Sequence, residues 1–285
     1  MNKLSIERQA QVIKVLCEGN SIRSTSRITN TSINTVVHLL EDVGMACHRY
    51  QDEHLVNLTT KRIECDEIWS FCHAKEDNLP PETKDKFGYG DVWTFVAIDA
   101  DSKLCVSWLV GEREPDYAYE FLKDVKRRLA NRVQLSTDGH RMYYQAVEGA
   151  FGGDNIDYDI IVKNYGTPFD VPPGKYSPGT IRRIYRKAVH GNPDAKKVST
   201  SYVERQNLTM RMNMRRFTRL TNGFSKKIQN HMFAIALHFM YYNFCKTHRS
   251  LANPYPRTPA MASGITDHIW TTEEIVGLIK NPINP

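Results

Sequence analysis

Long apolar runs are missing from this chain of 285 residues. The most apolar stretch covers residues 232–242 (MFAIALHFMYY), is interrupted by His238 and is too short to span a bilayer. The first residues, MNKLSIERQA, lack the apolar centre of a secretory signal. The sequence therefore predicts no membrane partner, and it favours a buried core helix over residues 232–242.

Paired cysteine motifs are also missing. None of the six cysteines forms a C-x-x-C pair, and no secretory signal precedes them. The pattern predicts reduced thiols in a cytoplasmic protein and argues against a disulfide framework or a zinc site. The cysteines are Cys17, Cys47, Cys65, Cys72, Cys105 and Cys245. Internal repeats and low-complexity tracts are not found either.

Charge is present without an extreme excess of either sign. The formal net charge is +6, with 41% hydrophobic and 25% charged residues, which is ordinary for a globular protein with a substantial core. The basic residues gather in two places: residues 204–227 hold seven cations and one acid, and RRIYRK occupies residues 182–187. Such clusters suit a polyanion such as nucleic acid, although solvated surfaces give the same pattern.

The N-terminal residues 1–48 have the pattern of a small all-α unit. Helical spacing over residues 6–17 is followed by Gly19, and Ser21 and Ser32 are suited to cap a second and a third helix. The predicted apolar stripe of the third helix is Ile33, Val36, Val37 and Leu40.

The remaining side chains of that third helix face outward, as in a helix-turn-helix whose third helix enters a DNA groove. The predicted DNA contacts of this unit are Ser32, Asn34, Thr35 and His38. A tri-helical unit that binds another protein would show the same pattern, so both readings stay open at this point.

The rest of the chain reads as a polar linker (49–61), a catalytic domain (62–250) and a Pro-rich C-terminal tail (251–285) with a helical end. Strands are predicted over residues 62–72, 92–100, 104–112, 133–139 and 158–165. Helices are predicted over residues 114–130, 141–151, 199–220 and 226–244, and residues 165–199 read as irregular. This order predicts a mixed α/β sheet with helices on both faces, as in the ribonuclease-H-like fold of retroviral integrases.

Three acids carry the predicted chemistry. Asp66 lies inside an apolar strand, where a charge is costly unless it is exposed, paired or bound to metal. Asp138 ends the fourth strand, and Glu204 begins a late helix. In a ribonuclease-H-like sheet the first and fourth strands are neighbours and the late helix crosses their edge, so the three carboxylates would converge. The adjacent Glu67 is predicted to point to the opposite face of its strand.

Converging carboxylates repel one another unless a cation neutralises them, and magnesium prefers oxygen ligands. The acids therefore predict two Mg²⁺ ions, with Mn²⁺ as a substitute, that support in-line attack on a phosphodiester. Each acid also has an ordinary explanation, since Asp-Gly is a common turn and Glu204 could be a plain surface residue. Against the latter, a helical wheel places Arg211 and Arg215 on the same flank as Glu204.

These motifs resemble the insertion-sequence-one family of DDE transposases. The resemblance runs from about residue 60 to the end, through DEIWSF, STDGHRMY, YVERQNLTMRMNMRRFTRLTNGFSKK and TPAMASGITDHIW. It implies that Asp66, Asp138 and Glu204 are the catalytic triad and that Arg211 is a basic residue following the glutamate. It also implies binding of terminal inverted repeats and target DNA, hydrolysis at the 3′ ends and joining of the 3′-hydroxyls to the target, with a homo-oligomer assembled on DNA.

Many members of that family begin with a cysteine-rich zinc segment, and this chain lacks that cysteine spacing.

Arg215 and Arg216 are predicted to contact DNA of any sequence. Two other functions fit the same motifs: a DNA-binding regulator without chemistry, and a stand-alone ribonuclease-H-like nuclease or resolvase. The complete triad argues against the first, and the N-terminal helical unit argues against the second.

Overall fold

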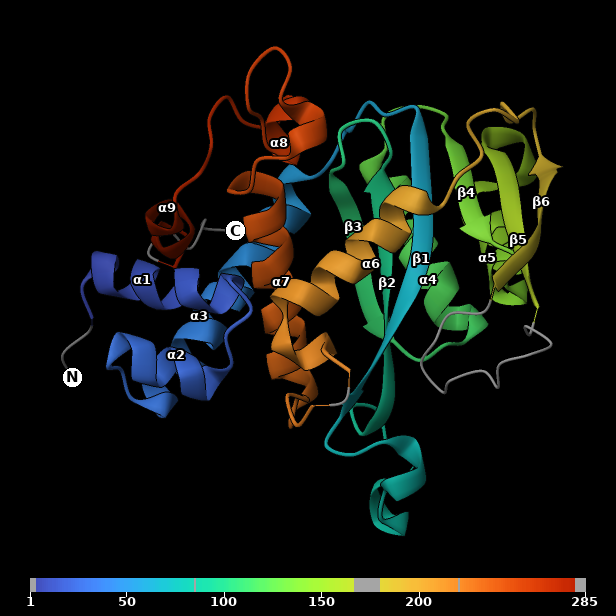
Figure 1. Ribbon diagram of the computed structural model, residues 1–285. Coiled ribbons are helices and arrows are strands. Elements are labelled where there is room, and N and C mark those ends of the chain that lie inside the picture. The colour runs from blue at the N-terminus through green and yellow to red at the C-terminus, as the bar shows by residue number, and fades with distance from the viewer. Residues whose placement is uncertain (1–3, 85, 167–179, 220, 280–285) are drawn as a thin grey trace.

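A six-stranded mixed sheet forms the centre of the protein (Figure 1). The computed structural model describes residues 4–84, 86–166, 180–219 and 221–279. The strands are β1 (Arg62–Cys72), β2 (Gly90–Asp99), β3 (Cys105–Gly111), β4 (Gln134–Asp138), β5 (Asp157–Gly166) and β6 (Thr180–His190).

The strand order is β3-β2-β1-β4-β5-β6. β1, β2 and β3 are antiparallel neighbours, β4 runs parallel to β1, β5 runs parallel to β4, and β6 returns antiparallel to β5. The first five strands fit the predicted ribonuclease-H-like arrangement, in which the first and fourth strands are neighbours. β6 adds one further strand at the edge.

Helices cover both faces of the sheet, as predicted. α4 (Pro115–Arg128) and α5 (Arg141–Phe151) pack on one face, and α6 (Ser201–Asn213) and α7 (Ile228–Phe244) cross the other (Figure 1). The alternation of side chains along β1 divides the core accordingly. Cys65 belongs to the core on the α4–α5 side, while Ile68 packs with Val203 of α6. The most apolar stretch lies within α7 and is buried, as the sequence favoured.

The N-terminal unit contains the three expected helices, α1 (Ile6–Cys17), α2 (Ile22–Thr29) and α3 (Ile33–His54). Ser21 and Ser32 accept hydrogen bonds from backbone N–H groups and cap α2 and α3, as predicted. The predicted apolar stripe is wrong at its first position. Ile33 is 47% exposed, because the packed stripe of α3 begins one turn later at Val36.

Residues 49–54 do not belong to a linker, because α3 continues through His54. Their polar groups are used in packing. Gln51 Nε2 donates to the carbonyl oxygen of Ala236 on α7 at 3.0 Å, and Arg128 of α4 donates to the carbonyl oxygens of Gln51 and Leu55 at 3.1 and 3.2 Å. Leu58 then forms a β-bridge with Leu129. The segment is therefore held to α4 and α7 by the Gln51 side chain and by backbone carbonyls, while Glu53 and His54 are exposed.

The segment predicted to be irregular contains β6, which pairs with β5 from His190 to Thr180. The four prolines before residue 180, Pro168, Pro172, Pro173 and Pro178, lie outside the described residues. The late helix is shorter than predicted: α6 ends at Asn213 and is followed by a 3₁₀ turn, Arg215–Phe217. Further 3₁₀ turns cover Glu76–Asn78, Pro81–Thr83, Gly153–Asn155 and Arg249–Leu251.

The C-terminal segment is packed against the N-terminal unit. It contains α8 (Pro259–Ala262) and α9 (Thr272–Gly277), and α9 contacts α1 and α3. Ile275 and Val276 of α9 are buried in the same core as α1. Across the described ranges, no helix has the length and apolar character needed to cross a membrane.

Candidate active site

The register between β1 and β4 brings two of the predicted acids together. Ile63 pairs with Leu135 and Glu64 with Ser136, and the same register continued by two residues sets Asp66 beside Asp138. β4 ends at Asp138, whereas β1 continues to Cys72. The acids therefore lie at the C-terminal end of β4, where β1 continues without β4 beside it. Crevices at such strand ends are common binding sites in α/β sheets.

Three carboxylates meet there. One oxygen from each of Asp66, Glu67 and Asp138 lies within 4.8 Å of the other two. Burial, followed by the negative charges of Glu67 and Asp138, raises the pKa of Asp66 to about 8. A hard divalent cation would remove this repulsion, and an all-oxygen donor set is the kind that Mg²⁺ prefers. The residues present therefore fit a magnesium ion.

Asp66 and Asp138 are held by neutral donors. Asn207 of α6 donates from Nδ2 to Asp66 Oδ2 at 2.8 Å, and the N–H of His140 donates to Asp138 Oδ1 at 3.0 Å. These contacts fix the position of each carboxylate without cancelling its charge. Asn207 Oδ1 is buried without a hydrogen-bond partner. The α6 helix thus reaches the cluster directly through Asn207.

Glu67 faces the other side of the sheet, as the strand alternation predicted. Its carboxylate accepts hydrogen bonds from Arg113 Nε at 2.7 Å and from the Tyr143 hydroxyl at 3.0 Å. Arg113 also lies over the ring of Trp93, 4.5 Å from its centre. Glu67 therefore has a cationic partner in the protein, which Asp66 lacks, but burial and the charge of Asp138 still raise the pKa of Glu67.

Glu204 lies in the first turn of α6 and is not part of the three-carboxylate cluster. It forms an ion pair with Lys163 of β5 and accepts a hydrogen bond from Thr200 Oγ1 at 2.7 Å. Its side chain is 45% exposed. Its charge nevertheless contributes to the raised pKa of Asp66, and it lies on α6, the helix whose Asn207 contacts Asp66. The structure brings Asp66 and Asp138 together and leaves Glu204 nearby, paired with Lys163.

Glu64 is a buried acid near the site that the sequence analysis did not single out. Its Oε2 accepts hydrogen bonds from the N–H groups of Tyr202 and Val203, at 2.7 and 3.1 Å. It therefore binds the N-terminus of α6, where free N–H groups favour a negative charge. Burial raises the pKa of Glu64. Its position two residues before Asp66, on the same strand face, was the available signal.

The predicted basic residues of the late helix have different environments. Arg211 is half-buried, its Nε has no hydrogen-bond partner, and burial lowers its pKa. Arg215 is exposed. Arg216 points inward: it donates to Ser225 Oγ at 2.8 Å, and burial lowers its pKa to about 10. Arg215 is thus accessible to DNA, whereas Arg216 is engaged inside the protein.

The helix α3, which begins with the predicted contacts, lies on the far side of α7 from β1 and β4 (Figure 1). Asn34 and His38 are exposed and Thr35 is half-buried. Ser32 accepts a hydrogen bond from the Thr35 N–H at 3.1 Å, and His38 lies 3.3 Å from a Glu41 oxygen. The predicted contacts of the N-terminal unit and the acid cluster therefore lie on different elements of the fold.

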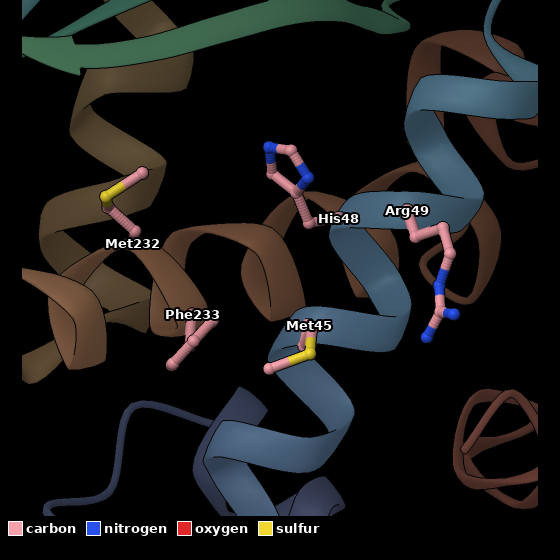
Figure 2. A pocket seen from close by; sticks show the side chains of 5 residues that line it. All are labelled: Met45, His48, Arg49, Met232 and Phe233. Carbon is pink, nitrogen blue, oxygen red and sulfur yellow. The ribbon is translucent and has the colours of Figure 1, made fainter. Parts of the chain in front are cut away.

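A third feature is an apolar groove between α3 and α7 (Figure 2). Its lining residues are Met45, His48, Arg49, Met232 and Phe233. It contains no carboxylate, and burial lowers the pKa of His48. The groove is thus chemically unlike the acid cluster and is not part of it.

Comparison with solved structures gives matches to Mos1 transposase. The Mos1 strand transfer complex is 12% identical with a TM-score of 0.24, and covers 55% of this chain and 59% of that chain. The Mos1 paired-end complex with the left transposon end and a pre-cleavage Mos1 transpososome are each 11% identical, with TM-scores of 0.23 and 0.21. The matches span about three-fifths of the Mos1 chains. No protein-family model and no curated protein matches this chain.

Proposed function

We propose that the protein is a DDE-type DNA transposase of the insertion-sequence-one family. It would bind the terminal inverted repeats of its element, hydrolyse phosphodiesters at the 3′ ends and join the 3′-hydroxyls to target DNA. The observation that carries the proposal is the meeting of Asp66 and Asp138 at the end of β4, beside the helix that carries Glu204. Such a cluster at a strand end serves a metal-dependent reaction better than it serves stability.

The proposed ligands of two Mg²⁺ or Mn²⁺ ions are Asp66, Asp138 and Glu204. When bound, such ions lower the pKa of an attacking water or hydroxyl and stabilise the leaving oxygen. Asn207 orients Asp66, and Glu64 holds the N-terminus of α6 and hence the start of the helix that carries Glu204. Glu204 must leave Lys163 to join the other two acids, which frees a cation beside the phosphate.

DNA recognition is assigned to two other sets of residues. On α3, Asn34, Thr35 and His38 would contact base edges, with Ser32 holding the helix start. Behind Glu204, Arg211 and Arg215 would contact phosphates, and Arg216 is a weaker candidate because it is engaged with Ser225. Because each element has two ends, we propose that the protein acts as a homo-oligomer on DNA.

The test compares cleavage and binding in the same variants. Asp66→Asn, Asp138→Asn and Glu204→Gln should each reduce Mg²⁺-dependent nicking at the element ends of a supercoiled plasmid by orders of magnitude. Their affinity for the same DNA should remain within a few-fold of that of the unsubstituted protein, since each change removes a negative charge near phosphates. Asp101→Asn, at an exposed acid, is the matched control.

Three outcomes would contradict the proposal. Cleavage of branched DNA without a preference for element ends would indicate a resolvase. Binding to element ends without any cleavage would indicate a regulator. Full activity of the three variants would place the chemistry elsewhere in the protein.

A further inference from the structure

The edge strand β6 carries a basic surface that the proposed chemistry does not use. All side chains from residue 181 to residue 188 are exposed. Four of them are cations within six residues: Arg182, Arg183, Arg186 and Lys187. Ile181, Ile184 and Tyr185 of the same strand are also 44–46% exposed, which is unusual for large apolar side chains at the edge of a sheet.

The register places one side of β6, with Ile184 and Arg186, on the carboxylate face of the sheet, and Arg183, Tyr185 and Lys187 on the opposite face. Asp138 pairs with Ile161 of β5, and Ile161 pairs with Arg186 of β6, so Arg186 lies two strands from Asp138, about 10 Å away. Lys163, which holds Glu204, pairs with Ile184. Arg183 lies further along, beyond the end of β4. From Arg186 to Arg183, β6 therefore extends away from the acid cluster.

Arg183, Arg186 and Lys187 of β6 form no ion pair with a carboxylate of the described residues. Arg183 donates to the Tyr185 hydroxyl at 2.9 Å and lies over the Tyr185 ring, and Arg186 donates to the carbonyl oxygen of Val198 at 3.3 Å. Residues 183, 185 and 187 alternate onto one face and form a row of cation, aromatic ring and cation.

We propose that β6 binds the sugar-phosphate backbone of the DNA strand that enters the carboxylate site. Arg183 and Lys187 contact phosphates on one face, Arg186 contacts a phosphate on the face of Asp138, and Tyr185 packs on a sugar between the first two. The proposal rests on the proposed function for the identity of the ligand. Charges also protect an edge strand from pairing with another sheet, but a single lysine is enough for that purpose.

The test measures the salt dependence of DNA binding for two double variants with equal charge loss. The first is Arg183→Gln with Lys187→Gln, and the control is Lys123→Gln with Lys126→Gln, at two exposed lysines of α4. The probe is a fluorescein-labelled 30-base-pair duplex, titrated in chelator over a range of KCl concentrations. Each phosphate contact on duplex DNA contributes about 0.9 to the slope of log K against log salt.

We expect the β6 variant to lower that slope by about 1.8 and the α4 control to leave it unchanged. Tyr185→Ala should weaken binding without changing the slope, because packing on a sugar is uncharged. Equal slopes for the two double variants would overturn the proposal. A β6 variant that self-associates with an unchanged slope would instead assign the charges to edge protection.

A second measurement uses the unsubstituted protein and therefore does not depend on variant folding. Duplex DNA should protect Arg183 and Arg186 from modification by phenylglyoxal, as read by mass spectrometry, and should leave Arg127 of α4 reactive. Equal reactivity with and without DNA would overturn the proposal. If the protein cleaves DNA with metal but the β6 double variant has an unchanged salt slope, only the inference about β6 fails. If the β6 double variant lowers the salt slope but the protein never cleaves DNA, only the proposed function fails.

Discussion

Under the proposed function, Asp66 combines a cost in stability with a role in the chemistry. It is buried beside Glu67 and Asp138, and its pKa is raised to about 8 by burial and by their charges. In the absence of metal, an ionised Asp66 therefore disfavours the folded state. Proteins commonly accept such destabilisation at a functional site.

We predict that Asp66→Asn raises the midpoint of thermal unfolding in chelator. The amide keeps the shape and can still accept the hydrogen bond from Asn207, while the repulsion is removed. Each kcal/mol gained would shift the midpoint by roughly 2–4 °C. Differential scanning fluorimetry should also show that Mg²⁺ stabilises the unsubstituted protein and not the variant. A lower midpoint for Asp66→Asn than for Asp101→Asn would contradict this explanation.

His231 predicts a pH dependence of stability. It is fully buried between Ser70 and Ser225, with ring nitrogens 3.1 and 2.9 Å from the two hydroxyl oxygens, and burial lowers its pKa from 6.5 to about 3. The unfolded chain therefore binds a proton that the folded chain does not bind between these two values. Folding stability should fall as the pH drops below 6.5, by about 1.4 kcal/mol per pH unit from this group.

His231→Gln keeps a donor and an acceptor but cannot be protonated. The destabilisation that it causes at pH 7 should therefore shrink between pH 6 and pH 4. Urea unfolding at several pH values measures the difference. Stability curves that run parallel for the variant and the unsubstituted protein would show that His231 is not held neutral by the fold.

The sequence could predict acids but not their partners. Asp66 and Asp138 were recognisable because acids in or at the end of apolar strands need an explanation. The ion pair between Glu67 and Arg113, and the role of Glu64 at the start of α6, depend on register and on the position of α6. The spacing along β1 could have shown that Glu64 shares a strand face with Asp66, but local spacing does not identify Arg113 or the start of α6 as the partners.

Gly44 shows how closely two helices pack. It lies on α3, and a Cβ placed there would be 2.4 Å from Cβ of Phe233 and 2.8 Å from its carbonyl oxygen on α7. Alanine normally stabilises a helix interior by about 1 kcal/mol relative to glycine. At this position the clash involves the backbone of α7, which cannot move aside easily.

We predict that Gly44→Ala destabilises the protein by about 1–3 kcal/mol, the usual range for overpacking. Gly277→Ala is the control, because it also lies in a helix and has no atom within 4 Å of the added Cβ. That variant should be neutral or more stable by up to about 1 kcal/mol. Chemical denaturation compares the two. Equal changes in unfolding free energy for the two variants would mean that α3 and α7 can move apart without loss of stability.

Elements with a clear apolar pattern were predicted well. β1 and α5 begin and end at the predicted residues, because alternation and helical spacing are both strong there. β6 was missed because its charged side chains hide the alternation expected of a half-buried strand. The length of α3 was underestimated because its last turns use polar side chains for buried hydrogen bonds, as Gln51 does.

At the scale of the whole molecule, the N-terminal unit and the sheet domain are joined by more than a linker. α3 crosses from one to the other, Arg128 ties its end to α4, and α9 packs on α1. The neighbouring positions of β1 and β4 were predicted from the order of elements along the chain, whereas β6 at the edge was not. The contact between the two ends of the chain was not predicted either, because no local pattern specifies it.

We predict that limited trypsin digestion does not release residues 1–48. The sites after Arg49 and Lys61 lie in α3 and beside a β-bridge, whereas Lys84 and Lys86 are exposed in the connection between β1 and β2. Early cleavage should therefore occur at Lys84 and Lys86. Mass spectrometry of the first fragments identifies the sites. Early cleavage after Arg49 or Lys61 would contradict this prediction and would support a linker over residues 49–61.

The most direct test of the central claim is the number of Mn²⁺ ions bound per chain, measured by electron paramagnetic resonance on the complex with duplex DNA and corrected for DNA alone. The unsubstituted protein and Glu67→Gln should bind two ions, since Glu67 is already paired with Arg113. Asp66→Asn and Asp138→Asn should lose binding, and Glu204→Gln should lose at least one ion. Normal binding by Glu204→Gln together with loss in Glu67→Gln would contradict the proposed triad and make Glu67 the third ligand.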